Sequence, residues 1–318
     1  MAGMGALPAR FRRERVLVVG CGDVGMRVVP LLRHKSTVLA LTSSGERMQA
    51  LRATGCKPLL GNLDDLQTLA RLAGLATRVL HLAPPPTEGV RWRQDPRTRH
   101  LAGVLARRSA PQVLVYGSTS GVYGDCAGNR VSESQPVQPH TPRAQRRVDA
   151  ERTLRQWSLQ TGTPTVVLRI PGIYAPDRAG GTPRERLLRG TPVLQAADDV
   201  YTNHIHATDL ARACQLALWR GARWRTVNVN DDSEWKMGDY MDAAADLMGL
   251  PRPPRVSRET AQATLPMSLL SFMGESRRLD NTRMKMVLGL VLRYPTPAEG
   301  LVANLEPEPL ERFQHSAR

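Results

Sequence analysis

A regular alternation of short apolar runs with amphipathic patterns is the feature that most restricts the fold of this chain. The run "RVLVVG" at residues 15–20 is followed by a segment in which Val24, Val28 and Leu31 recur at helical spacing. Further apolar runs occur in "TVLALT", "CKPLLGN", "ATRVLHLAPPP", "PQVLVYGS" and "TPTVVLRI", each separated from the next by a helical pattern. Such alternation is typical of strands joined by crossover helices. We therefore predict an α/β fold, a Rossmann-type doubly wound parallel sheet.

The alternation becomes less regular after Pro171. Two helical patterns, "TDLARACQLALWRG" and "MGDYMDAAADLMGL", lie on either side of a strand-like "RWRTVNVN". We predict a flexible basic tail at residues 1–14 and a dinucleotide-binding Rossmann domain at 15–172. Residues 173–318 are expected to form a smaller C-terminal α/β substrate lobe, with some of its elements returning to the main domain.

A glycine turn joins the first strand to the first helix. Gly20, Gly22 and Gly25 form G-x-G-x-x-G, and Asp23 and Val24 begin the helix. The first glycine permits a tight turn, the second lets a diphosphate approach the backbone, and the third allows close helix packing. The helix N-terminus also favours an anion. We predict a dinucleotide site here; the alternative is a tight turn without a ligand.

The residues after the second strand indicate which dinucleotide binds. A carboxylate at this place holds the ribose hydroxyls of NAD, and an arginine accommodates the 2′-phosphate of NADP. The sequence "ALTSSGER" has no carboxylate before Glu46 and offers Ser43, Ser44 and Arg47. We therefore favour NADP(H) over NAD(H). Alternatively, these residues only cap the following helix.

The ends of the third and fourth strands face the same edge of the predicted sheet. Asn62 and Leu63 are expected to flank the adenine. Ala83, Pro84 and Pro85 are expected to lie along the cofactor, although a rigid strand exit would also explain the prolines.

A cluster of hydroxyls ends the fifth strand, in "PQVLVYGSTSGVYGD". Ser118 and Thr119 come directly after a buried run, and Tyr123 follows four residues later. The hydroxyls are candidates for hydrogen bonding to a reacting oxygen. A turn in which they satisfy backbone groups is the alternative.

Six segments in order, "GCGDVG", "GNLDD", "LHLAPPP", "YGSTSGVYGD", "LRIPGIYAP" and "NHIHATDLARA", resemble the extended short-chain dehydrogenase/reductase superfamily over residues 15 to 300. The resemblance is to its nucleotide-sugar epimerase/dehydratase branch, in particular to atypical members with G-x-G-x-x-G. It implies that Thr119 holds the reacting oxygen, with Ser118 beside it. It also implies that Pro171, Gly172 and Ile173 meet the nicotinamide carboxamide.

The resemblance fails at the catalytic tyrosine and lysine of that family. Their positions fall on Arg143 and Arg147, and no Tyr-x-x-x-Lys occurs in the chain. Arg143 cannot transfer a proton because a guanidinium stays charged and has no acceptor. Arg147 could still hold the ribose or a phosphate. Tyr123, His140 and Tyr174 are the candidate replacement donors, and each could instead be structural.

Two further groups of residues are chemically suggestive. His204 and His206 share a strand face, but no carboxylate or cysteine partner is evident, so no metal is predicted. In the resembling family Asp209 of His-x-x-Asp is structural. Arg184, Arg186 and Arg189 fall where that family lines its substrate cleft, and they either clamp a diphosphate or form a solvated helix face.

Composition limits the class of partner. The net charge of +15 comes mostly from arginines dispersed along the chain, so we expect a small anionic substrate rather than a specific nucleic acid or membrane. Four scattered cysteines predict neither zinc nor disulfides. We expect a cytoplasmic protein. The family resemblance also implies a homodimer through the helix that holds Arg143 to Leu159.

We therefore predict an NAD(P)-binding epimerase/dehydratase-like oxidoreductase, with hydride transfer on an anionic nucleotide-sugar and a degenerate Tyr/Lys pair. The alternative is a catalytically inactive NADP(H)-binding sensor or assembly protein. The missing tyrosine and lysine favour the alternative, and the glycine turn with Thr119 favours the enzyme.

Overall fold

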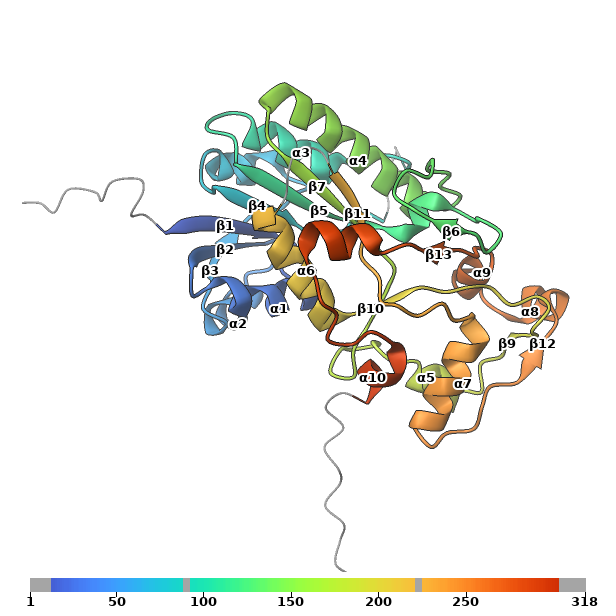
Figure 1. The fold of residues 1–318 in the computed structure, drawn as a ribbon. Helices are drawn as coiled ribbons and strands as arrows, with labels where there is room; N and C mark the ends of the chain where they lie inside the picture. Colours follow the sequence, from blue (N-terminus) through green and yellow to red (C-terminus); the bar gives the residue numbers. More distant parts are fainter. Residues whose placement is uncertain (1–12, 88–91, 221–224, 303–318) are drawn as a thin grey trace, which may run out of the picture.

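The computed structural model describes residues 13–87, 92–220 and 225–302 (Figure 1). Almost all of the predicted tail at 1–14 therefore lies outside the described residues. Within those residues, no helix combines the length and the apolar character needed to cross a membrane.

The central layer is a seven-stranded sheet with the order β11-β7-β5-β4-β1-β2-β3, in which every neighbouring pair is parallel (Figure 1). Its strands are β1 (Glu14–Val19), β2 (Ser36–Thr42), β3 (Lys57–Leu60), β4 (Arg78–His81), β5 (Val113–Thr119), β7 (Thr165–Ile170) and β11 (Arg225–Asn228). The order reverses between β1 and β4, which is where ligands bind in doubly wound sheets. The predicted Rossmann-type fold is confirmed.

Helices cover both faces of this sheet, as Figure 1 shows. One face carries α1 (Asp23–Leu32), α2 (Arg47–Ala53) and α6 (Ala207–Arg220), whose buried side chains share a hydrophobic cluster with the strands. The other face carries η2 (Leu66–Leu72), α3 (Pro96–Leu105) and α4 (Pro142–Thr161). Because both faces are covered, β1 and β7 contain the continuous apolar runs Val16–Val19 and Val166–Leu168.

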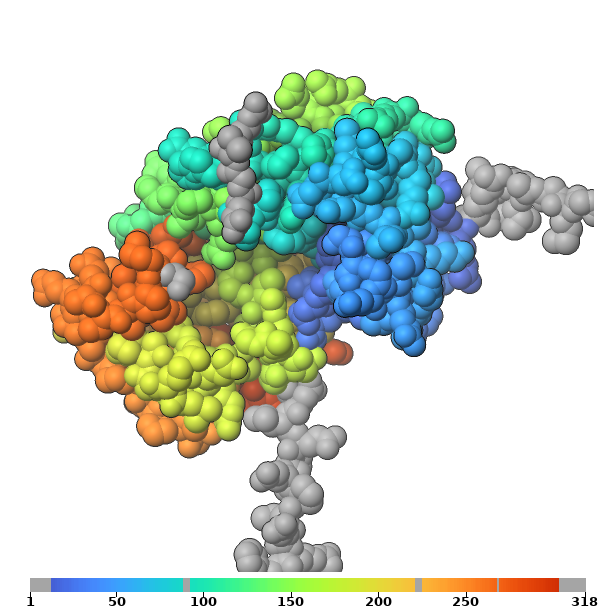
Figure 2. Space-filling view, turned by 180° about the vertical axis from the view of Figure 1, so that it is seen from behind, coloured from blue at the N-terminus to red at the C-terminus, as the bar shows by residue number. Residues whose placement is uncertain are grey.

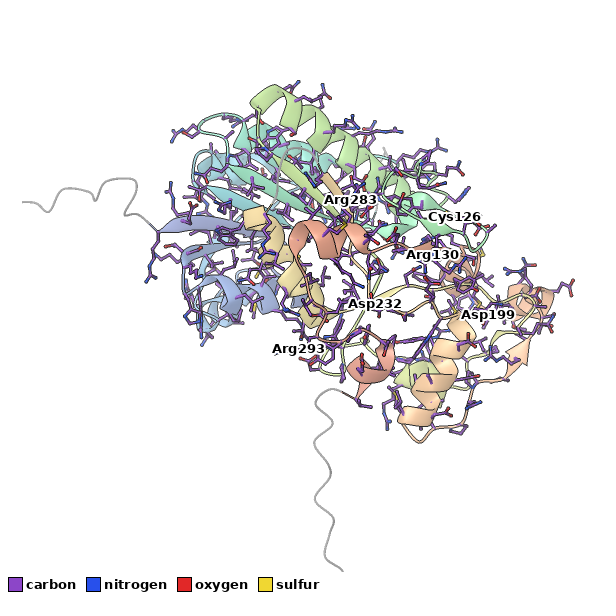
Figure 3. The ribbon with its side chains drawn as sticks, in the orientation of Figure 1. Cys126, Arg130, Asp199, Asp232, Arg283 and Arg293 are labelled. Carbon is purple, nitrogen blue, oxygen red and sulfur yellow. The ribbon has the colours of Figure 1, made fainter. Side chains whose placement is uncertain are left out.

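The chain after residue 171 contributes both to the main sheet layers and to a separate hydrophobic cluster. α6 and β11 join the main sheet layers. A separate hydrophobic cluster gathers Tyr174, Leu187, Val193 and the inner face of α7 (Met237–Leu247), and we call this part the smaller lobe. Asp199 lies beside α7 (Figure 3) and accepts a hydrogen bond of 2.9 Å from the Gly238 N–H, which satisfies part of the helix N-terminus.

The remaining elements are short. They are η3 (Ser120–Tyr123), β6 (Arg130–Val131), β8 (Gly172–Tyr174), α5 (Arg184–Leu188), β9 (Val193–Leu194), β10 (His204–His206), β12 (Arg255–Val256), α8 (Arg258–Thr264), α9 (Met267–Met273), β13 (Arg278–Leu279), η4 (Met284–Leu288) and α10 (Pro297–Leu301). Figure 2 shows the molecule hollowed between its blue N-terminal part and its yellow and orange C-terminal part.

Candidate active site

The glycine turn between β1 and α1 has the geometry that a dinucleotide requires. Gly20 has φ +83°, and a Cβ there would lie 2.2 Å from the Ala83 nitrogen. A Cβ on Gly22 would meet nothing within 4 Å, so the space above this residue is open. Gly22 is also the N-cap of α1, and no side chain caps the helix. Free N–H groups facing open space fit a diphosphate, so this turn suits the cofactor.

The residues predicted for the 2′-phosphate lie beside this turn. Arg47 donates a hydrogen bond of 2.7 Å to the Cys21 carbonyl, which brings its guanidinium over the glycine turn. In the described part of the chain, the hydroxyls of Ser43 and Ser44 have no hydrogen-bond partner, and neither caps α2. The alternative interpretation, in which these hydroxyls cap α2, is therefore not supported.

The residues predicted for the adenine and the cofactor flank follow β3 and β4. The Asn62 side chain accepts a hydrogen bond of 3.0 Å from the Asp64 N–H, and Leu63 is buried. Ala83 packs against Gly20, and the Pro84 carbonyl accepts a hydrogen bond of 3.1 Å from Arg97. These residues, together with Pro85, stand at the expected sheet edge but outside the wall of the cavity described next.

A cavity of about 680 Å³ opens between the glycine turn and the smaller lobe. Its wall contains Gly22, Thr119 and the predicted nicotinamide segment Pro171, Gly172 and Ile173. The described wall also contains five arginines, Arg143, Arg147, Arg178, Arg186 and Arg277, against two carboxylates, Asp23 and Glu275. The cavity is therefore strongly cationic and suited to anions.

The two hydroxyls at the end of β5 differ in their partners. Ser118 lies in the wall, but its hydroxyl donates a 2.5 Å hydrogen bond to Glu151, a buried carboxylate that pairs with Arg169. Thr119 Oγ1 accepts a hydrogen bond of 3.3 Å from the Gly121 N–H. Its own O–H remains available to a substrate oxygen in the cavity, so Thr119 suits the predicted role better than Ser118.

Arg143 and Arg147 lie one turn apart on α4 and both reach the cavity. Arg147 donates to the Tyr116 hydroxyl at 3.0 Å and to the Gly117 carbonyl at 2.7 Å. The Arg143 guanidinium lies 5.4 Å from the centre of the Phe272 ring and has no hydrogen-bond acceptor among the described residues. Partial burial and the charge of Arg147 lower the pKa of Arg143, which an incoming anion would offset.

The prediction of Tyr123 as a proton donor is wrong. Its ring is buried under the Arg169 guanidinium, its hydroxyl donates a 2.7 Å hydrogen bond to Asn228, and it lies outside the described cavity wall. Burial also raises the pKa of Tyr123, which makes it a weaker acid. His140 packs beside Gly124, away from the wall. Tyr174 reaches the wall, but its hydroxyl donates to the Thr296 carbonyl at 3.1 Å.

Two wall residues that follow α9 were not predicted from the sequence. Glu275 pairs with Arg277 at 2.8 Å, and its second oxygen, Oε1, is buried without a hydrogen-bond partner among the described residues. Arg277 also donates to the Gly124 carbonyl at 2.7 Å. No local motif marks either residue, because only the tertiary fold brings them into the same cavity wall as Arg143.

Of the three arginines predicted to line the substrate cleft, only one lies in the described cavity wall. Arg186 lines the cavity, and its Nε and Nη2 are buried without partners in the described chain. Arg184 and Arg189 are exposed and lie outside the wall. Burial lowers the pKa of Arg186, so it too would gain from an anionic partner.

His204 and His206 lie on β10 within an aromatic cluster. The His204 ring stacks on Tyr240 at 4.1 Å, and the His206 ring lies 3.9 Å from that of Tyr294. The described residues contain no group of three metal-ligating side chains. Asp209 accepts hydrogen bonds from the N–H of Arg293, labelled in Figure 3, and of Tyr294, so its role is structural.

Because His204 and His206 are buried, we predict that the free energy of unfolding falls in acid. Burial lowers the pKa of His204 and of His206 to about 4, below the ordinary value of 6.5. Their contribution is complete above pH 6.5 and is lost as the pH falls through 4, because the unfolded chain then binds more protons. Urea titrations should show that His204→Phe reduces the pH slope of the unfolding free energy by up to about 1.4 kcal/mol per pH unit.

The exposed His34 provides the control for this experiment. His34→Phe should retain the wild-type slope between pH 4 and 6.5. A His204→Phe variant with the same slope as wild type would contradict the assignment of the pH dependence to this ring.

Comparison of the sequence with known proteins agrees with this geometry. The model of the NAD dependent epimerase/dehydratase family matches residues 16–229. The chain is also similar to the dTDP-D-glucose 4,6-dehydratases of Homo sapiens and Bos taurus, at 25% identity over 143 residues. These residues are 42% of this chain and 40% of the human protein, so the match spans well under half of the curated relatives.

Solved structures match almost the whole chain. A conserved protein of unknown function from Silicibacter pomeroyi is 28% identical, with a TM-score of 0.75 over 91% of this chain and 97% of its own. MoeE5 in complex with UDP-glucuronic acid and NAD is 25% identical, with a TM-score of 0.69 over 91% and 96%. UDP-glucuronic acid 4-epimerase from Bacillus cereus, solved with NAD, shares the fold at 17% identity, with a TM-score of 0.70 over 90% and 95%.

Proposed function

Because this chain belongs to the NAD-dependent epimerase/dehydratase family, we propose that it is an NADP(H)-preferring oxidoreductase of an anionic, nucleotide-sugar substrate. The observation that carries the proposal is the cavity of about 680 Å³, which joins the glycine turn and Thr119 to five arginines. Its size suits a ligand that extends from the nicotinamide position into the smaller lobe.

The preference for NADP(H) rests on the residues after β2. The end of this strand offers two unpartnered hydroxyls, from Ser43 and Ser44, and the Arg47 guanidinium, but no carboxylate for ribose hydroxyls. An arginine with neighbouring hydroxyls suits a 2′-phosphate. MoeE5 and the Bacillus cereus epimerase were solved with NAD, so the preference sets this chain apart from these two proteins.

The anionic substrate is supported by the unpartnered cations in the cavity. Arg143 has no acceptor, and Arg186 has two buried donors without partners in the described chain. Leaving such donors unpaired is costly, and a carboxylate or diphosphate would satisfy them in bidentate fashion. UDP-glucuronic acid, which is bound by MoeE5, carries both groups and is the substrate chemistry we favour.

The cofactor would supply hydride transfer, and the chain must manage the accompanying proton. Thr119 donates its hydroxyl hydrogen to the reacting oxygen, and Arg143 stabilises negative charge on the substrate. We assign the transfer of this proton to Glu275, the wall carboxylate whose Oε1 has no hydrogen-bond partner in the described chain. Arg277 holds Glu275 in place through their 2.8 Å ion pair.

The rival function is NADP(H) binding without turnover, as a redox sensor or assembly protein. The loss of the family's tyrosine and lysine favours this rival. Fluorescence titration with NADPH and NADH, followed by absorbance assays of a nucleotide-sugar panel, separates the two functions. We expect tighter binding of NADPH and turnover that is lost in Thr119→Ala. Dinucleotide binding without turnover of any substrate would support the sensor, and no affinity for either dinucleotide would overturn both functions.

Arg143→Gln should selectively weaken binding of the acidic substrate. A charge-assisted hydrogen bond is worth about 1.5–3 kcal/mol, so we expect a ten- to hundredfold higher Kd for UDP-glucuronic acid. The Kd of UDP-glucose, which lacks the carboxylate, should change much less. Arg189→Gln, an exposed arginine outside the cavity, is the matched control and should change neither. Equal losses for both sugars in Arg143→Gln would contradict carboxylate recognition.

A further inference from the structure

Four charged side chains connect the first turn of α1 to the loop that follows β8. Arg27 Nη2 lies 3.2 Å from Asp23 and 2.8 Å from Asp177. Arg178 Nε lies 3.8 Å from Asp23 Oδ2, which is beyond hydrogen-bond distance. Asp23 therefore faces two arginines, and the glycine turn is tied electrostatically to a loop of the smaller lobe.

The loop at residues 175–181 is held in shape by its own backbone hydrogen bonds. The Ala175 N–H donates to the Gly181 carbonyl at 3.1 Å, and the Gly181 N–H donates to the Arg178 carbonyl at 2.9 Å. A Cβ on Gly181 would lie 2.5 Å from the Ala175 oxygen, so the turn is too tight for another residue. Arg178 is thus presented from a preformed turn, which reduces the entropy lost when it binds.

One end of the Arg178 guanidinium has no partner. Its Nη1 is buried and makes no hydrogen bond within the described chain. Arg178 lines the same cavity as Gly22 and Asp23, at the uncapped N-terminus of α1. The free N–H groups of the helix and the Arg178 side chain thus line the same cavity from two lobes. A buried guanidinium nitrogen without an acceptor is costly, so an anion is expected between them.

We propose that Arg178 grips the cofactor's diphosphate from the smaller lobe, opposite the glycine turn. This inference rests on the proposed dinucleotide function and adds a residue that the G-x-G-x-x-G turn does not contain. The long contact with Asp23 gives way to a charge-assisted hydrogen bond with a phosphate oxygen. Arg27 remains paired with Asp23 and Asp177, which weakens but does not abolish the repulsion between these carboxylates and the diphosphate.

Adenosine diphosphate ribose is the probe for this proposal, because it carries the diphosphate without the nicotinamide. Isothermal titration should give Arg178→Gln a Kd at least tenfold higher than wild type for this probe and for NADPH alike. Arg189→Gln is the matched control and should bind as wild type. Thermal unfolding followed by circular dichroism should be unchanged in Arg178→Gln, since its side chain makes no short ion pair.

Asp23→Asn provides a second, opposite test. Removing this carboxylate frees Arg178 and reduces repulsion, so the probe should bind several-fold more tightly than to wild type. In the double variant with Arg178→Gln, most of this gain should be lost, because the two residues are coupled. Equal gains with and without Arg178 would overturn the proposal.

The remaining outcomes separate this inference from the proposed function. Wild-type binding of both ligands with no change in Arg178→Gln would overturn only the Arg178 assignment. Weaker binding of UDP-sugars but not of adenosine diphosphate ribose would also overturn it, since Arg178 would then hold the substrate's diphosphate. No binding of either dinucleotide to wild type would overturn the function itself.

Discussion

Gly22→Ala should bind either nicotinamide dinucleotide about a hundredfold more weakly than wild type and unfold at the same temperature. The new methyl group would project into open space within the cavity wall, where it touches no protein atom within 4 Å. A diphosphate would have to move away from the N–H groups of α1. Each charge-assisted hydrogen bond lost costs about 1.5–3 kcal/mol, and a hundredfold change corresponds to about 2.7 kcal/mol.

Fluorescence titration and thermal unfolding on the same preparation test this expectation. Gly20→Ala is the contrasting variant, because its Cβ would lie 2.2 Å from the Ala83 nitrogen at φ +83°. That change should destabilise the fold, whereas Gly22→Ala should not. A Gly22→Ala protein with wild-type affinity would remove the glycine turn from the cofactor site.

Glu151→Leu should lower the free energy of unfolding by about 3–5 kcal/mol. Glu151 is buried, with Oε2 2.8 Å from Arg169 Nη2 and Oε1 2.5 Å from the Ser118 hydroxyl. Both side chains of the ion pair are only 8% exposed, so the substitution leaves a buried guanidinium without its counterion. Urea denaturation monitored by circular dichroism measures the loss.

Glu185→Leu is the matched control, because Glu185 pairs with Arg189 at 3.8 Å and both side chains are well exposed. Its effect should stay within about 1 kcal/mol, as for other surface pairs. Adding Arg169→Met to Glu151→Leu should recover part of the loss, since no charge then remains buried. A Glu151→Leu protein as stable as the control would contradict the importance of this pair.

Local patterns were sufficient for the sheet and for the glycine turn. Each apolar run became a parallel strand, because strands covered on both faces are apolar throughout and stand out from amphipathic helices. The segment after β3 was less well predicted. Its spacing predicts an α-helix, but the segment forms the 3₁₀ helix η2. The Asp65 side chain caps this helix by accepting a hydrogen bond from the Gln67 N–H.

The proton-transferring group could not be predicted from the sequence. Tyr123 follows Thr119 closely in the sequence, but its hydroxyl is buried and donates to Asn228, 105 residues away on β11. Glu275 was overlooked because it lies in a segment without a motif, between α9 and β13. Both outcomes depend on which distant strand or loop packs against α4 and β5.

The predicted dimer through α4 stays a prediction. The outer face of this helix exposes Arg152, Gln156 and Leu159, a mainly polar surface.

The sequence by itself determined the parallel sheet, the glycine turn and the loss of tyrosine and lysine at the catalytic positions. These features depend on residue type and on spacing within one or two elements, which periodicity and glycine conformation report directly. Only the tertiary structure decided which guanidinium groups line the cavity with donors that have no hydrogen-bond acceptor in the described chain, as in Arg143, Arg178 and Arg186. It also decided that the hydroxyls of Ser118 and Tyr123 are bound by Glu151 and Asn228. Burial and hydrogen-bond pairing arise between residues far apart in the chain, so no local pattern specifies them.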